Sequence, residues 1–127
     1  MIEFLIVGLG GFIGACLRFA ITKLTGHFSL ASPLSTLISN VAAGLVIGFI
    51  LGLEQQSIAI NTKTKLFLTT GLLGGLSTFS TFSLETVKLF QDDKFFFAAC
   101  NIALNVALSL FGVLGGMVCA KAIFKKS

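Results

Sequence analysis

Four long apolar stretches dominate the sequence and limit what the chain can fold into. They cover residues 4–24, 33–53, 66–90 and 95–120, and the charged residues fall mainly between them. A helix of about 20 apolar residues crosses a hydrocarbon core of roughly 30 Å. Because backbone polar groups inside a bilayer must pair within the protein, helices are the expected structure. The sequence predicts an all-α, multi-pass integral membrane protein, with residues 1–127 forming a single four-helix transmembrane domain.

The third stretch contains a polar run, GGLSTFSTFS, over residues 74–83. Unpaired polar groups cost several kcal/mol each in hydrocarbon, so such a run is expected where it is buried in protein or lines a polar path. We interpret it as part of a pore wall. Its two adjacent glycines, Gly74 and Gly75, serve either close helix packing or a helix break whose freed carbonyls meet a cation. The residues alone favour the two interpretations equally.

Polar residues recur at helical spacing in the second and fourth stretches. Thr36 and Asn40 are four residues apart, and so are Asn101, Asn105 and Ser109. Hydrogen bonding between helices is the simpler interpretation for Asn105 and Ser109. Asn40, near the middle of its stretch, fits a conduction path equally well, with Thr36 one turn before it.

Phe79 and Phe82 are three residues apart and share one face of a helix. The chain has 14 phenylalanines, so packing or lipid contact is the default interpretation. A phenyl ring nevertheless has a positive edge, which can favour an anion where no fixed cation is present. Neutral amide and hydroxyl donors would complement such edges, and weak donors let an ion leave as well as enter.

Two charged residues lie inside apolar stretches. Arg18 can extend its head to the membrane surface or meet a carboxylate, and Glu85, just after the polar run, is a possible partner. We expect both to serve structure or a vestibule. The remaining Lys and Arg are scattered without a basic face, which excludes nucleic-acid binding.

The distribution of positive charge predicts the topology. The two membrane sides hold nearly equal numbers of Lys and Arg: Lys63, Lys65, Lys121, Lys125 and Lys126 against Arg18, Lys23, Lys88 and Lys94. Since Lys and Arg in short loops normally fix orientation, a chain this balanced can insert both ways. We expect an antiparallel, dual-topology homodimer with inverted symmetry.

A small four-helix multidrug or cation exporter is the main alternative. Such a protein would need a membrane-buried carboxylate for protons and Trp or Tyr for a flat cation, whereas this chain has no Trp or Tyr and no acidic residue between Glu3 and Glu54. A purely structural membrane protein leaves the polar run unexplained. No constellation of nucleophile, base and acid indicates an enzyme.

Three segments resemble one known family. These are residues 10–15 (GGFIGA) with Arg18, residues 33–40 ending in Asn40, and the run 74–83 followed by Glu85. Together they resemble the CrcB/Fluc fluoride channels, and the third segment is the most specific. The resemblance covers three of the four stretches.

This resemblance implies passive fluoride export across a bacterial-type plasma membrane, lowering cytoplasmic fluoride. It also implies a broken third helix, an antiparallel dimer with two pores and a structural Na⁺ ion at the dimer centre, beside the helix breaks. The residues that it implies are Gly74 and Ser77 for sodium through their backbone carbonyls, Asn40, Phe79 and Phe82 for the pore, Ser80, Thr81, Ser83 and Ser109 for a polar track, and Arg18 and Glu85 for the vestibule.

Overall fold

The computed structural model describes residues 1–26 and 31–125, and every regular element in these ranges is helical. The elements are α1 (Ile2–Leu24), α2 (Ala31–Gln55), α3 (Thr62–Leu66), the π-helix η1 (Phe67–Leu73), α4 (Gly74–Leu76), α5 (Phe79–Gln91) and α6 (Phe95–Ile123). Three helical segments are long and apolar enough to cross a membrane: Ile2–Leu24, Pro33–Gln55 and Phe95–Ile123. The all-helical fold class is therefore confirmed.

The third stretch is interrupted, as expected. Helix continues through α3, η1 and α4, then Ser77 and Thr78 adopt extended backbone angles (φ −78°, ψ 153° and φ −152°, ψ 121°). Helix resumes as α5, which Thr78 caps by accepting a hydrogen bond from the Thr81 backbone N–H at 3.2 Å. The break thus lies just after Leu76.

The position of the break corrects the expectation drawn from the two glycines. Gly74 is helical, with φ −63° and ψ −36°, and Gly75 lies within α4. A Cβ atom at Gly75 would lie 2.6 Å from the backbone oxygen of Gly11, so this glycine allows α4 to approach α1 closely. Gly75 serves packing, and the backbone changes direction two residues after it.

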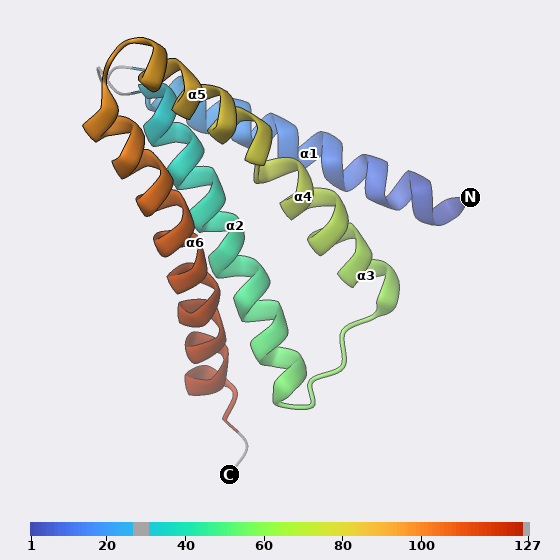
Figure 1. Cartoon of the computed structure of the whole chain (residues 1–127). Coiled ribbons are helices and arrows are strands. Elements are labelled where there is room, and N and C mark those ends of the chain that lie inside the picture. Colours follow the sequence, from blue (N-terminus) through green and yellow to red (C-terminus); the bar gives the residue numbers. More distant parts are fainter. Residues whose placement is uncertain (27–30, 126–127) are drawn as a thin grey trace.

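The helices form two arms that diverge from a common end (Figure 1). The first arm consists of α1 packed against η1 and α4, and the second consists of α2 packed along α6. Helix α5 lies where the arms meet and contacts both helices of the second arm. The N-terminus and the C-terminal end of α6 lie at the far ends of different arms.

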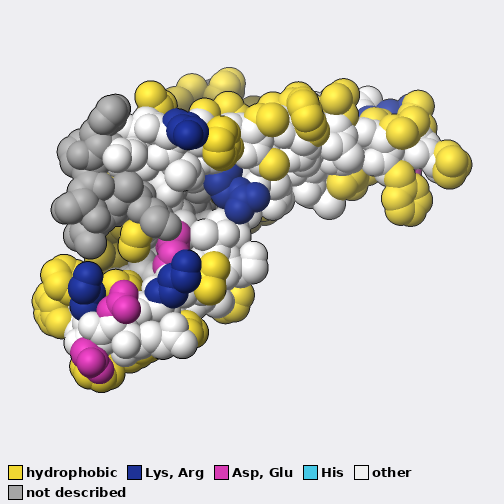
Figure 2. Space-filling model, turned by 90° about the horizontal axis from the view of Figure 1, so that it is seen from above, with side chains coloured by type: hydrophobic (Ala, Val, Ile, Leu, Met, Phe, Trp, Pro, Cys, Tyr) yellow, Lys and Arg dark blue, Asp and Glu magenta, His cyan; other side chains and the backbone are white. Residues whose placement is uncertain are grey.

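The outer surfaces of the arms are strongly apolar. Phe4, Phe12 and Phe111, for example, are between 66% and 80% exposed. Seen from above, hydrophobic side chains run along the arm that carries α1, and charged side chains gather toward the end opposite the N-terminus (Figure 2). Such a surface suits contact with lipid or with another apolar protein surface.

Candidate functional site

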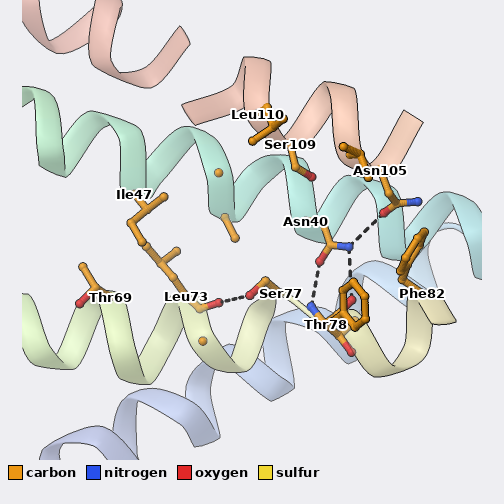
Figure 3. Close-up of a pocket in the computed structure, with 15 residues that line it drawn as sticks. Asn40, Ile47, Thr69, Leu73, Ser77, Thr78, Phe82, Asn105, Ser109 and Leu110 are labelled. Atoms are coloured by element: carbon orange, nitrogen blue, oxygen red, sulfur yellow. Dashed lines mark hydrogen bonds between the residues drawn. The ribbon is translucent and has the colours of Figure 1, made fainter. Parts of the chain in front are cut away.

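A groove with a volume of about 550 Å³ opens between the two arms. Apolar residues of α2 and α6 form much of its wall. Its polar and aromatic lining comes from α2, η1, α6 and the region of the break, where Gly74 also lines it: Asn40, Thr69, Ser77, Thr78, Phe79, Phe82, Asn105 and Ser109 (Figure 3). Residues from three separate stretches of sequence therefore meet in one cavity.

Asn40 connects the second helix to the break. Its Oδ1 atom accepts a hydrogen bond from the Thr78 backbone N–H at 2.8 Å, and its Nδ2 atom donates to the Thr78 carbonyl at 3.3 Å. The same Nδ2 atom donates to Oδ1 of Asn105 at 3.0 Å (Figure 3). Asn40 thus pairs with the backbone of Thr78, one of the two extended residues, and also with Asn105 of α6.

Asn105 confirms the expected hydrogen bonding between helices. It is 5% exposed and, besides accepting from Asn40, donates from Nδ2 to the carbonyl oxygen of Asn101 at 2.9 Å. Ser109, one turn further along α6, lines the groove and makes no hydrogen bond to any described residue. Its hydroxyl is therefore available to a ligand in the groove, unlike the Asn105 amide.

The two phenylalanines of the polar run lie together on α5. Their ring centroids are 5.4 Å apart and the ring planes are inclined by 54°. Phe82 is 9% exposed while Phe79 is 78% exposed, and both line the groove. They share a helix face as the spacing predicts, with one ring inside the protein and the other at the rim.

A second, smaller cavity of about 290 Å³ holds other predicted site residues. Its lining includes Arg18, Thr36, Thr81 and Glu85. Thr36 donates its hydroxyl hydrogen to Oε1 of the buried Glu85 at 2.7 Å. Arg18 and Glu85 line the same cavity but do not form an ion pair with each other. The sequence suggested that they could be partners, and the structure shows only that they lie close together.

A comparison with protein families assigns the chain. The model of the CrcB-like proteins, described as Camphor Resistance (CrcB), matches residues 5–117, which run from α1 to the last turns of α6. The chain belongs to the CrcB family. The residues that line both cavities fall within the matched range.

Several CrcB relatives carry a functional name. The fluoride-specific ion channel FluC of Clostridium novyi is 46% identical to this chain over 94% of both chains. The protein of the same name from Ruminiclostridium cellulolyticum is 46% identical over 97% of this chain and 95% of its own. FluC 1 from Methanosarcina acetivorans is 34% identical over 94% of this chain and 92% of its own. The similarity thus spans nearly the whole length of each protein.

The break in this CrcB chain leaves several carbonyl oxygens without their helical donors, among them those of Gly74 and Ser77. In a continuous helix, Gly74 would accept from the Thr78 N–H and Ser77 from the Thr81 N–H. The first N–H instead donates to Asn40 and the second to the Thr78 hydroxyl. Within the described ranges neither carbonyl accepts a hydrogen bond. Unwound carbonyls of this kind suit a hard cation such as Na⁺, so the residues fit the expected ion.

Two predicted track residues line neither cavity of the CrcB chain. Ser80 is exposed, and Ser83 donates its hydroxyl hydrogen to the Phe79 carbonyl at 2.9 Å. Thr78 and Thr86, in contrast, were not singled out from the sequence, although both make side-chain hydrogen bonds at the site. For Thr78 a signal existed, because a threonine just before a helix is a preferred N-cap.

Proposed function

We propose that this CrcB protein is a fluoride-selective channel that exports fluoride passively across the plasma membrane and lowers its cytoplasmic concentration. The observation that carries the proposal is the meeting of Phe79, Phe82 and neutral polar groups in one groove of a protein whose relatives are named fluoride-specific channels. The activity is conduction rather than catalysis. The proposal places this activity in a bacterial-type plasma membrane.

The chemistry of the groove suits a small anion. Among the described residues that line it, none carries a charge. An anion there would meet ring edges of Phe79 and Phe82 and the hydroxyl of Ser109. Because these contacts are weak individually, they replace part of the ion's hydration without binding it so tightly that it cannot leave.

We further infer that two copies assemble antiparallel in the membrane. The groove between the arms is open, and Phe79 at its rim is 78% exposed, although an aromatic ring in a pore needs protein on its other side. Nearly equal positive charge on the two sides permits both orientations. An antiparallel copy would close the groove and give two equivalent pores.

A structural Na⁺ ion at the centre of this dimer is part of the proposal. The carbonyl oxygens of Gly74 and Ser77 would bind it, because both lack hydrogen-bond donors among the described residues. The ion would supply a fixed positive charge that stabilises two helix breaks facing each other across the dimer axis.

The second cavity would serve as a vestibule. It combines Arg18 and Glu85 with the hydroxyls of Thr36 and Thr81, so an ion arriving there meets charged and polar groups before it reaches the phenylalanines. Ser80 and Ser83 would extend the polar track along α5. The multidrug-exporter alternative is not favoured, because the relatives compared above are named fluoride-specific channels and the groove lining contains no acidic residue within the described ranges.

A flux assay tests the function. Purified protein is reconstituted into liposomes loaded with potassium fluoride, and release is followed with a fluoride electrode after valinomycin addition. Parallel vesicles hold chloride, and protein-free vesicles give the leak. We expect fast fluoride release with chloride release near the leak, whereas equal release of both ions, or none from folded protein, would contradict the proposal.

A further inference from the structure

A directional chain of hydrogen bonds leaves the break and crosses two helices. It starts at the Thr78 backbone N–H, which donates to Asn40 Oδ1 at 2.8 Å. Asn40 Nδ2 then donates to Asn105 Oδ1 at 3.0 Å. Asn105 Nδ2 donates in turn to both oxygens of Asn101, the backbone oxygen at 2.9 Å and Oδ1 at 3.1 Å. Every link so far donates in the same direction.

The second half of the chain returns to the helix that carries the phenylalanines. Asn101 Nδ2 donates to the hydroxyl oxygen of Thr86 at 2.9 Å. The Thr86 hydroxyl donates to the carbonyl oxygen of Phe82 at 2.8 Å. The chain therefore begins at the break and ends at the backbone of the buried ring in the groove.

Chemistry fixes the direction of the chain at both ends. A backbone N–H can only donate and a backbone carbonyl can only accept, so the Thr78 N–H and the Phe82 carbonyl cannot exchange roles. An Asn40 amide turned by 180° would set its NH₂ group against the Thr78 N–H. In the observed orientation the Asn40 NH₂ group faces the Oδ1 acceptor of Asn105. The Asn105 side chain cannot turn to offer its NH₂ group instead, because that group donates to Asn101.

Burial makes these links difficult for water to replace. Asn105 is 5% exposed, Thr86 is 6% exposed and Asn101 is 8% exposed. A buried amide that loses its partner keeps an unsatisfied polar group, and the loss propagates along a polarised chain. Removing one member should therefore disturb its neighbours more than its own volume suggests.

We propose that Asn105 is a positioning residue that holds the Asn40 amide in the orientation that keeps the third-helix break open. Asn40 is then principally the clamp of the break, because both of its amide hydrogens are donated to Asn105 and the Thr78 carbonyl. With the clamp in place, the Thr78 N–H stays away from the Gly74 carbonyl, which remains available to a cation. The effect on flux rests on the proposed function, but the effect on the break does not.

Hydrogen–deuterium exchange on Asn105→Leu in the reconstituted full-length protein tests this proposal. Leucine is similar in size to asparagine and removes the acceptor for Asn40. We expect exchange at the Thr78 amide to accelerate about tenfold, as for the loss of one hydrogen bond, with exchange in α1 unchanged. Fluoride release from liposomes should fall together with this local change.

Two further variants keep the test decisive. Asn101→Ala leaves Asn105 in place but removes part of its support, and we expect about threefold faster exchange at Thr78; this variant replaces Asn105→Leu if the latter does not fold. Ile102→Ala, on the same turns of α6 but outside the chain of hydrogen bonds, should change neither exchange nor flux.

Each outcome separates the positioning role from the channel function. Faster exchange confined to residues 77–81 supports the proposal even if the wild-type protein releases no fluoride, in which case only the proposed function fails. Reduced flux with unchanged Thr78 exchange would mean that Asn105 contacts the ion path directly and would overturn the positioning role. Faster exchange throughout the protein would also overturn it, because that pattern reports general loosening.

Discussion

The Asn40 side chain lines the groove, yet both of its amide hydrogens are donated within the protein. Its three hydrogen bonds go to Thr78 and Asn105, two residues that are 38 and 65 positions away in sequence. Helical spacing alone indicates that Asn40 shares a stripe with Thr36, but Thr36 faces the second cavity and donates to Glu85. Spacing predicts a common face, whereas partners on other helices decide which cavity each residue lines.

Substituting the two groove phenylalanines separates ring chemistry from ring volume. Phe79→Ile and Phe82→Ile keep apolar bulk but remove the positive ring edge, so fluoride release should fall roughly tenfold in each variant. The ion-electrode assay measures this directly. Phe111→Ile, a change at an exposed ring of α6 outside the groove, should release fluoride at the wild-type rate. Wild-type rates in both groove variants would remove the rings from the ion path.

At the scale of elements, the sequence predicted the long helices closely and the break only approximately. For α1, α2 and α6, the observed ends lie within three residues of the expected spans, because hydrophobic length fixes them. The break was expected from Gly74 and Gly75, but tertiary contacts place it at Ser77 and Thr78. The Asn40 clamp and the Thr78 cap stabilise the extended residues there. The cap is a local signal that the sequence offers, whereas Asn40 lies 38 residues away in sequence and no local propensity indicates its contact with Thr78.

The π-helix η1 was not expected from the sequence. It spans Phe67–Leu73, immediately before α4, where the first arm packs most closely. Gly71 faces Gly10 of α1 so closely that a Cβ atom would lie 3.0 Å from the Gly10 Cα atom. Such π-type turns are rare and are often found near functional sites. The amino-acid composition of residues 67–73 does not distinguish a π-helix from an α-helix.

Glycine substitution tests the packing of the second arm. Gly48 of α2 lies against the backbone of Val113, and a Cβ atom there would collide with the Val113 carbonyl. Gly48→Val should therefore separate α2 from α6 and lower the free energy of unfolding by about 3 kcal/mol or prevent folding. Unfolding titrated with sodium dodecyl sulfate measures this change.

Gly8 provides the matched control for Gly48. It is also helical, but nothing lies within 4 Å of a Cβ atom built at this position. Gly8→Ala should be neutral or stabilising by up to about 1 kcal/mol, because alanine is the better helix former. Equal losses of stability in Gly48→Val and Gly8→Ala would contradict the conclusion that close contact between α2 and α6 is what requires glycine at position 48.

For the whole molecule, the near-equal numbers of Lys and Arg on the two membrane sides lead to a prediction about topology. Removing positive charge from one side should force a single orientation. One triple variant is Lys63→Gln/Lys121→Gln/Lys125→Gln. It keeps two of the five positive residues on its side of the membrane, against four on the other side. We expect this variant to insert one way and to release little fluoride by itself. Labelling of Asp92→Cys from outside intact cells, in a background without the three native cysteines, reports the orientation.

The opposite bias supplies the control for this topology experiment. Lys23→Gln/Lys88→Gln/Lys94→Gln leaves one positive residue against five and should insert the other way up. Expression of both variants together should restore antiparallel pairs and fluoride release. Full activity of either variant expressed alone would contradict the antiparallel dimer.

The reversal potential of single channels in a planar bilayer tests the central claim most directly. With a tenfold fluoride gradient, symmetric sodium and impermeant counter-ions, the account predicts reversal about 59 mV from zero, at the fluoride equilibrium potential. The same value should hold when chloride is added to one side and when the pH of one side is changed. A reversal potential that follows chloride or the proton gradient would contradict a passive, fluoride-selective path through the groove of Phe79 and Phe82.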